Sequence, residues 1–286
     1  SSRPCSFCID ANVPYQTLPF DVIEEDLRFL LTKFDKPLVA WHDPNFGIKF
    51  DQYMSLTERA VPPRSINFIA ETSLSILTEP HLRRMRDNGV VALLPGIESW
   101  YDLGGKSRVG RTTGTDKLKR ISEHVNLIQS YIPYLQTNFV LGMDNDQGQE
   151  PFELTKRFVD LCPAAFPGYS LLTSYGSAAP LNLEYQKAGR ILPFPFPLLN
   201  NNLAMNVRPK HYSWVEFYDH LIDVVAHTFS PQAIYRRFAS ATQRETRWLN
   251  LIRGVSQEGR GRLRHHRRIR ELLASDRAFR DYFEGE

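Results

Sequence analysis

The 286-residue sequence predicts an α/β protein with a parallel sheet and a mostly helical C-terminal extension. Two observations predict this class. Apolar runs alternate with amphipathic stretches at roughly 30-residue spacing from residue 19 to residue 175, the rhythm of consecutive βα units. The apolar runs are continuous rather than alternating, as expected for strands buried on both faces of a sheet. Such strands are joined by right-handed crossovers and run parallel.

The chain predicts five strands, each followed or preceded by a helix. The strands are expected at residues 37–41, 66–72, 90–99, 134–144 and 166–175. Apolar residues at helical spacing predict helices over residues 19–31, 50–61, 79–88, 116–131 and 151–161. Pro62, Pro63 and Gly89 end the second and third of these helices.

The composition changes beyond about Asn182, and we expect residues 1–182 and 183–286 to form two domains. The proline- and asparagine-rich stretch Ile191–Asn202 predicts an extended strap. Residues 214–229 and 231–252 each predict an amphipathic helix packed on the sheet.

The net charge is only +3, but basic residues are concentrated between Arg260 and Arg270. Such a cluster can meet phosphates or an acidic surface. We favour a docked terminal helix, because acidic residues and an apolar side follow in the same segment. The sequence has three cysteines, no apolar run long enough to span a membrane and no visible signal peptide, so we expect a cytoplasmic protein.

Polar residues follow the predicted strands, at the point where each strand ends. The carboxyl ends of parallel strands share one mouth in a barrel or an open sheet. We therefore expect these polar side chains to converge there, with the N-terminal cysteine loop on the same rim. The residues are Asp43, Asn45, Glu71, Glu98, Ser99 and Asn138.

Cys5 and Cys8 stand at a Cys-x-x-Cys spacing, which turns two soft sulfur ligands to the same side of a loop. The spacing alone leaves open a redox dithiol, half of a zinc site, part of an iron–sulfur site or two unremarkable thiols. His42 is a candidate third ligand for zinc. Cys162, at a predicted helix end, is interpreted as a buried apolar residue.

The N-terminal loop resembles the cluster motif of the radical S-adenosylmethionine (radical SAM) superfamily. In that Cys-x-x-x-Cys-x-x-Cys motif, three thiolates hold a [4Fe–4S] cluster and leave one iron open for S-adenosylmethionine. Cys5 and Cys8 match the second and third positions, and Phe7 matches the aromatic residue before the third. The first position is occupied by Ser1, whose oxygen is a harder ligand than a thiolate. The resemblance implies that Cys5 and Cys8 bind the cluster.

Strand-end segments carry the rest of the resemblance, which covers roughly residues 1–180. Residues 96–99 are similar to the family's Gly-Ile-Glu-Ser segment, which contacts the ribose and amino acid portion of S-adenosylmethionine. Residues 42–46 resemble a turn near the methionine amine in cobalamin-associated members, and residues 139–143 resemble the adenine-flanking segment. Asp144-Asn-Asp146 replaces the family's usual glycine and glutamate ending there. The implied cofactor-binding residues are Phe7, Asp43, Asn45, Glu71, Gly96, Glu98, Ser99, Asn138, Gly142 and Met143.

The resemblance implies a partial (β/α)6 TIM-like barrel of five strands that lacks its first strand. We infer that Ser1 is not the natural start and that a cobalamin-binding domain could precede it. The implied chemistry is reductive cleavage of S-adenosylmethionine and hydrogen abstraction from an unidentified small-molecule or lipid-like substrate, with methyl transfer or rearrangement as further outcomes. The implied electron donor is a flavodoxin or ferredoxin.

Two other functions stay open from the sequence. Ser1 and the altered residues 144–146 are also compatible with a binding or scaffold protein that keeps the fold without a cluster. The basic tail, with Lys106, Arg108 and Arg111, is compatible with a nucleic-acid-binding module, which we do not favour.

Overall fold

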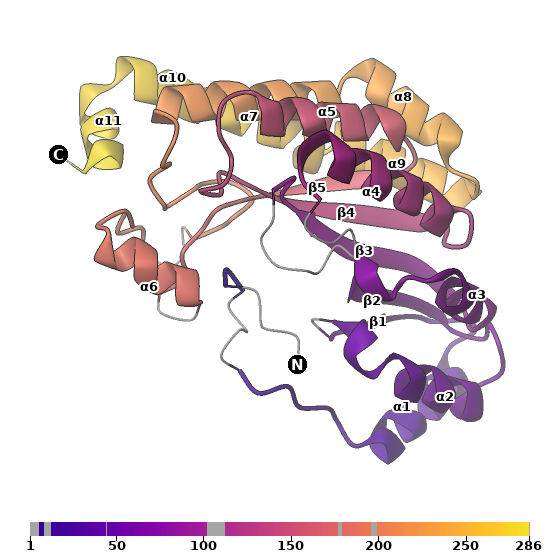
Figure 1. Cartoon of the computed structure of the whole chain (residues 1–286). Helices are drawn as coiled ribbons and strands as arrows, with labels where there is room; N and C mark the ends of the chain where they lie inside the picture. The colour runs from indigo at the N-terminus through magenta and orange to yellow at the C-terminus, as the bar shows by residue number, and fades with distance from the viewer. Residues whose placement is uncertain are drawn as a thin grey trace.

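The computed structural model describes residues 6–8, 13–43, 45–101, 112–176, 179–195 and 199–285. Its centre is one parallel sheet in the spatial order β1-β2-β3-β4-β5 (Figure 1). The five predicted strands are confirmed, although the fourth and fifth end earlier than predicted. The strands are β1 (Leu38–Trp41), β2 (Asn67–Ser73), β3 (Val90–Glu98), β4 (Tyr134–Leu141) and β5 (Phe166–Leu171).

Helices connect consecutive strands and cover the outer side of the sheet, so the predicted βα rhythm is confirmed (Figure 1). The connecting helices are α2 (Phe50–Ala60), α3 (Glu79–Asp87), α4 (Gly114–Gln129) and α5 (Glu150–Leu161), and α1 (Phe20–Lys33) precedes β1. All four strand pairs are parallel, so each connection is a crossover. The spatial order of the strands follows the chain order, as it does in a (β/α) barrel. The predicted partial TIM-like barrel is thus confirmed.

Local sequence explains where several helices begin. Thr78 caps α3 by accepting a hydrogen bond from the His81 amide, and Pro80 lies in the first turn. Ser213 and Ser230 act in the same way on the two helices that follow them in the C-terminal extension. Such caps satisfy amides that have no partner within the helix.

Aromatic side chains fill the space between the sheet and the helices. Trp100 lies 5.6 Å from Phe139 and 5.9 Å from Phe158, measured between ring centroids, and these side chains are at most 2% exposed. Phe139 also contacts Tyr169 on β5. Cys162 is 1% exposed at the end of α5, which confirms its interpretation as a buried apolar residue.

The C-terminal extension is helical, as predicted, and most of it packs over the β4–β5 side of the sheet (Figure 1). The prediction of one helix over residues 231–252 is wrong, because the chain turns at Ala241 and the Arg247 guanidinium donates to the Ala241 carbonyl. The helices are α6 (Pro180–Lys187), α7 (Trp214–Thr228), α8 (Pro231–Ser240), α9 (Arg244–Val255), α10 (Arg262–Ser275) and α11 (Arg277–Glu284).

The basic tail forms α10, which packs along α7 with Ile269 and Leu273 buried. This confirms the docked helix. A separate helix, α11, follows it, because Asp276 caps the first turn of α11 by accepting from the Phe279 amide. The strap also has partners, since Asn201 accepts a hydrogen bond from the Leu171 amide of β5. Among the described helices, none combines the length and apolarity needed to cross a membrane.

Candidate functional site at the carboxyl ends of the strands

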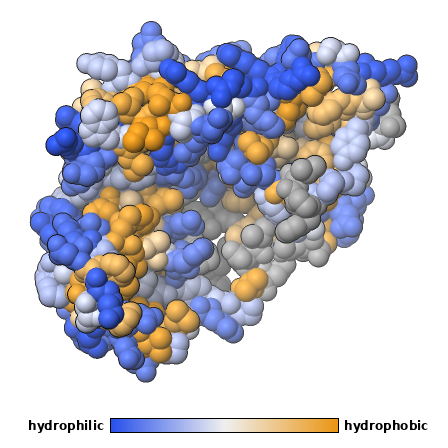
Figure 2. Space-filling view, turned by 180° about the vertical axis from the view of Figure 1, so that it is seen from behind, coloured by the Kyte–Doolittle hydropathy of each residue, from blue (hydrophilic) through white to orange (hydrophobic). Residues whose placement is uncertain are grey.

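A hollow of about 110 Å³ lies at the carboxyl ends of β2, β3 and β4. Seen from behind, the molecule is hollowed near its middle, between the first strands and the C-terminal helices (Figure 2). The residues that line the hollow are Asn45, Glu71, Thr72, Ser73, Leu94, Gly96, Glu98 and Asn138. Four of the six strand-end residues expected to converge therefore do so, and so does Gly96. Their role in ligand binding stays a prediction.

Glu98 ends β3 with a backbone φ of 66°, a left-handed conformation that is unusual for a residue with a side chain. Its carboxylate folds back over Gly96. A Cβ atom at position 96 would lie 2.1 Å from Glu98 Oε1, so only glycine permits this position of the carboxylate. Strained backbone of this kind persists where the surrounding structure determines it, and it is common at ligand sites.

Asn45 joins the turn after β1 to the end of β2. Its Oδ1 accepts hydrogen bonds from the Gly47 and Ser73 amides, each at 3.3 Å. Because these two amides engage the oxygen, the side chain presents its NH2 group elsewhere. Asn45 thus enters the hollow with a defined orientation.

Asp43 is not among the residues that line the hollow, and both of its oxygens have partners in the turn, on α2 and in the segment before α1. Oδ1 accepts from the Asn45 amide at 2.8 Å. Oδ2 accepts from the hydroxyls of Tyr15 at 2.5 Å and Tyr53 at 2.9 Å. Burial, and then the Asp43 carboxylate, raise the pKa of Tyr15 well above its usual range. In this arrangement Asp43 positions the turn that carries Asn45.

Ser99, Gly142 and Met143 meet at a second buried point, centred on Asp146. Asp146 Oδ1 accepts from the Ser99 hydroxyl at 3.2 Å, and Oδ2 accepts from the Gly142 and Met143 amides at 3.3 and 3.2 Å. Asp146 is 3% exposed, and burial raises its pKa to about 7 despite these hydrogen bonds. Asp146 therefore ties the end of β3 to the turn after β4, next to the hollow.

The structural role of residues 144–146 could not be foreseen from the sequence, where they stand only as a departure from a family pattern. Asp144 forms a two-pronged ion pair with Arg190, with both N–O distances at 2.8 Å. Arg190 also stacks over the Tyr185 ring at 4.8 Å and donates to the Arg208 carbonyl. The pair anchors the segment after α6 to the rim of the sheet. The sequence signal for this role is the pair of carboxylates, Asp144 and Asp146, directly after a predicted strand.

The N-terminal segment 6–8 lies beside α6, on the side of the sheet where the strands end (Figure 1). The Ser6 carbonyl accepts a hydrogen bond from the Leu181 amide in the first turn of α6, at 2.9 Å. Phe7 packs against the hydrophobic core, and Cys8 is partly exposed. Cys5, Lys106, Arg108 and Arg111 lie outside the described residues. Within the described ranges, no three His, Cys, Asp or Glu side chains are placed to hold a metal ion.

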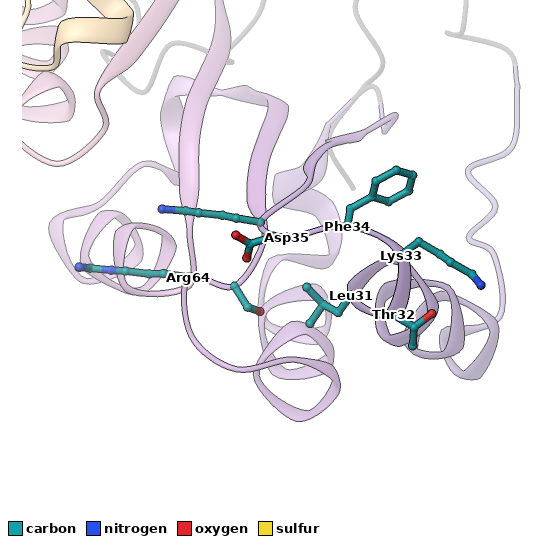
Figure 3. A pocket seen from close by; sticks show the side chains of 8 residues that line it. Leu31, Thr32, Lys33, Phe34, Asp35 and Arg64 are labelled. Carbon is teal, nitrogen blue, oxygen red and sulfur yellow. The ribbon is translucent and has the colours of Figure 1, made fainter.

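A larger depression of about 450 Å³ lies at the opposite, amino ends of β1 and β2. Its side chains, including Lys33, Phe34 and Arg64, point in different directions rather than toward a common centre (Figure 3). The smaller hollow is lined by two carboxylates and two side-chain amides from neighbouring strand ends, so we regard it as the candidate site.

Comparisons with known proteins bear on the fold. Two similar solved structures are both of TsrM from Kitasatospora setae, a radical S-adenosylmethionine methyltransferase. The one with cobalamin and a [4Fe-4S] cluster bound has a TM-score of 0.57 and 12% sequence identity, over 96% of this chain and 60% of that chain. The one with tryptophan substrate and the analogue aza-SAM bound has a TM-score of 0.56 and 12% identity, over 94% and 61% of the chains. No protein-family model and no curated protein matches the sequence.

The chain therefore has a radical SAM-like fold, and the resemblance drawn from its motifs is confirmed at the level of fold. It spans about three fifths of the length of the compared TsrM chains.

Proposed function

We propose that this chain binds S-adenosylmethionine at the hollow and acts as a radical SAM enzyme on a small substrate. One observation carries the proposal: Asn45, Glu71, Gly96, Glu98 and Asn138 converge at the carboxyl ends of strands in a radical SAM-like fold. In a parallel α/β fold, ligands bind at this end of the sheet. The convergence lies in the segments that carry the family resemblance.

The residues of the hollow suit part of S-adenosylmethionine. The carboxylates of Glu71 and Glu98 accept hydrogen bonds from hydroxyl or ammonium groups and favour a cationic ligand. The amides of Asn45 and Asn138 complement them. A hollow of about 110 Å³ accommodates a sugar ring or an amino acid head group rather than the whole molecule. Glu98 is assigned to the ribose and Asn45 to the amino acid end, while Asp43 and Asp146 hold the surrounding turns.

Cys5 and Cys8 would hold a [4Fe–4S] cluster, which supplies the electron for reductive cleavage of the sulfonium. Cys8 fits this role in being a partly exposed thiol on a segment that Ser6 anchors to α6. The task of the protein is then to orient the ligand and to keep water from the reaction. Cobalamin is a further candidate cofactor, because the compared methyltransferase binds it.

The test is anaerobic reconstitution of the full chain with iron and sulfide, followed by S-adenosylmethionine, with dithionite or reduced flavodoxin as the electron donor and with or without cobalamin. We expect cluster absorption in the visible range that Cys8→Ala removes, and formation of 5′-deoxyadenosine and methionine. Binding without cleavage would instead identify a non-catalytic member of the fold. Absence of both the cluster and binding would refute the proposal.

Glu98→Gln tests the hollow itself. We expect the dissociation constant of S-adenosylhomocysteine, measured by calorimetry, to rise about tenfold or more, because a charge-assisted hydrogen bond is lost. The matched control is Glu123→Gln, which changes an exposed glutamate on α4 that is not among the residues lining the hollow. Equal affinity of wild type and Glu98→Gln would remove Glu98 from the site.

A further inference from the structure

A chain of hydrogen bonds starts in the C-terminal extension and ends in the hollow. Arg253 of α9 donates from Nη1 to Gln136 Oε1 at 2.8 Å. Gln136 Nε2 donates in turn to Asn138 Oδ1, also at 2.8 Å. Gln136 and Asn138 are two residues apart on β4, so their side chains share the face of the strand that Asn138 turns to the hollow.

Arg253 is firmly held. Its Nε donates to Glu258 Oε2 at 2.7 Å, and Nη2 donates to Glu258 Oε1. Its guanidinium lies 3.9 Å from the centroid of the Phe166 ring, and Nη1 also reaches the Tyr134 hydroxyl. Only 20% of the Arg253 side chain is exposed. An arginine fixed by a carboxylate, an aromatic ring and a hydroxyl has little freedom to turn away from Gln136.

The donor and acceptor in each of these hydrogen bonds follow from the chemistry of the side chains. Arginine has donors and no acceptor, so the Gln136 atom that meets Arg253 must be the carbonyl oxygen. The other end of the Gln136 amide is then NH2, and the Asn138 atom that meets it must be oxygen. The remaining group of Asn138, its Nδ2 amide, is therefore a donor.

Gly168 of β5 leaves room for the hydrogen bond between Gln136 and Asn138. It lies opposite Asn138 in the strand register. A Cβ atom at position 168 would be 2.6 Å from Asn138 Oδ1 and 3.1 Å from Gln136 Nε2. A side chain there would push directly on the hydrogen bond between the two amides.

We propose that Arg253 is a positioning residue, which acts through Gln136 to fix Asn138 with its NH2 group as the donor offered to the ligand. The hollow then presents a donor on β4 opposite the acceptors Glu71 and Glu98. The ligand group against Asn138 must be an acceptor, such as a hydroxyl oxygen, a ring nitrogen or a carboxylate. We call the hydrogen bonds from Arg253 through Gln136 to Asn138 the relay. The relay is independent of any ligand, but its role in recognition rests on the proposed binding of S-adenosylmethionine.

Gln136→Glu is the sharpest variant. A glutamate keeps the contact with Arg253 but cannot donate to Asn138, so Asn138 turns its NH2 group inward and presents oxygen to the hollow. We expect the S-adenosylhomocysteine dissociation constant of the reconstituted full chain to rise at least tenfold, with no loss of thermal stability. Gly168→Ala is expected to weaken binding by an independent route. Arg244→Met, an exposed arginine on the same helix, is the control and should bind like wild type.

A second readout needs no ligand. The side-chain amide resonances of Gln136 and Asn138 are followed by ¹⁵N NMR in wild type, Arg253→Lys and Arg253→Met. We expect Arg253→Met to shift both resonances and Arg253→Lys, which keeps a donor, to shift them less. An unchanged Asn138 resonance in folded Arg253→Met would overturn the relay. Shifted resonances with equal affinity of wild type and Gln136→Glu would overturn its role in recognition. Shifted resonances with no binding by wild type would leave the relay standing and reject the proposed function.

Discussion

The two edge strands of the sheet run in the same direction but have different surroundings. At β5, the Leu171 amide donates to the Asn201 carbonyl, and Arg262 donates to the Tyr169 carbonyl, so the strap and α10 cover this edge. At β1, alternate residues are exposed, and Leu38 is 63% exposed. Hydrophobic side chains gather on the surface near α1 and β1 in the view from behind (Figure 2).

The C-terminal extension therefore covers only one edge of the sheet, the one formed by β5. In the β3–β5 half, aromatic rings and buried polar anchors lie beneath the C-terminal extension. Strand β1 packs Trp41 against Phe46, Tyr53 and Phe68 on one face but exposes Leu38 on the other. The hollow lies between the two halves, with Asn45 and Glu71 from the first and Asn138 from the second. We therefore expect substitutions of buried residues in the covered half to change stability far more than substitutions at the exposed positions of β1.

Phe139→Ala should have the largest effect, because it removes a ring packed against Trp100, Phe158 and Tyr169. We expect a loss of about 3–5 kcal/mol in the free energy of unfolding, measured by urea denaturation. A loss below about 1 kcal/mol would mean that the core of this half is not as well packed as the contacts indicate.

Asp146 should make the covered half sensitive to pH. Its folded-state pKa is raised to about 7, so its protonated form is favoured by folding, and stability should fall as pH rises from about 4 to about 7. The slope from this one group approaches about 1.4 kcal/mol per pH unit. Asp146→Asn should remove that part of the pH dependence of urea denaturation. An unchanged profile would contradict the assignment.

The ion pair of Asp144 with Arg190 should contribute less, because both side chains are partly exposed, at 26% and 16%. A double-mutant cycle with Asp144→Asn and Arg190→Met should give a coupling of about 1–2 kcal/mol in the free energy of unfolding. Arg28→Met is the matched control, because the Arg28 side chain is 56% exposed in its pair with Glu24 on α1, and its cost in the free energy of unfolding is expected below about 0.5 kcal/mol. If Arg190→Met and Arg28→Met lowered the free energy of unfolding equally, Arg190 would not have its anchoring role.

Leu38→Ala should have the smallest effect, below about 0.5 kcal/mol, because the side chain is already in water. Leu171→Ala makes the same chemical change at the other edge, where the side chain is 2% exposed, and should cost about 2–5 kcal/mol. The ratio of the two values measures the asymmetry of the sheet directly. Similar costs would show that the β1 edge is covered in solution.

Most of the architecture could be predicted from the sequence, because strands and helices follow from local hydrophobic periodicity. The break between α8 and α9 at Ala241 could not, because no proline or glycine marks the turn and the hydrophobic pattern continues through it. Asn45, Glu71, Glu98 and Asn138 were predictable as neighbours, because parallel strands place their carboxyl ends together. Asp43 and Ser99 were expected beside them, but partners distant in sequence hold both elsewhere.

Short-range pattern and strand direction specify the succession of strands and helices, the buried faces and the edge of the sheet at which polar residues meet. Which polar groups face the hollow, and which are held behind it, depends on contacts that form only in the folded chain. The contact of Arg253 with Gln136 joins residues 117 positions apart in the chain, and no local pattern encodes such a pairing. The orientation of a side-chain amide depends on every partner around it, and those partners come together only when the chain folds.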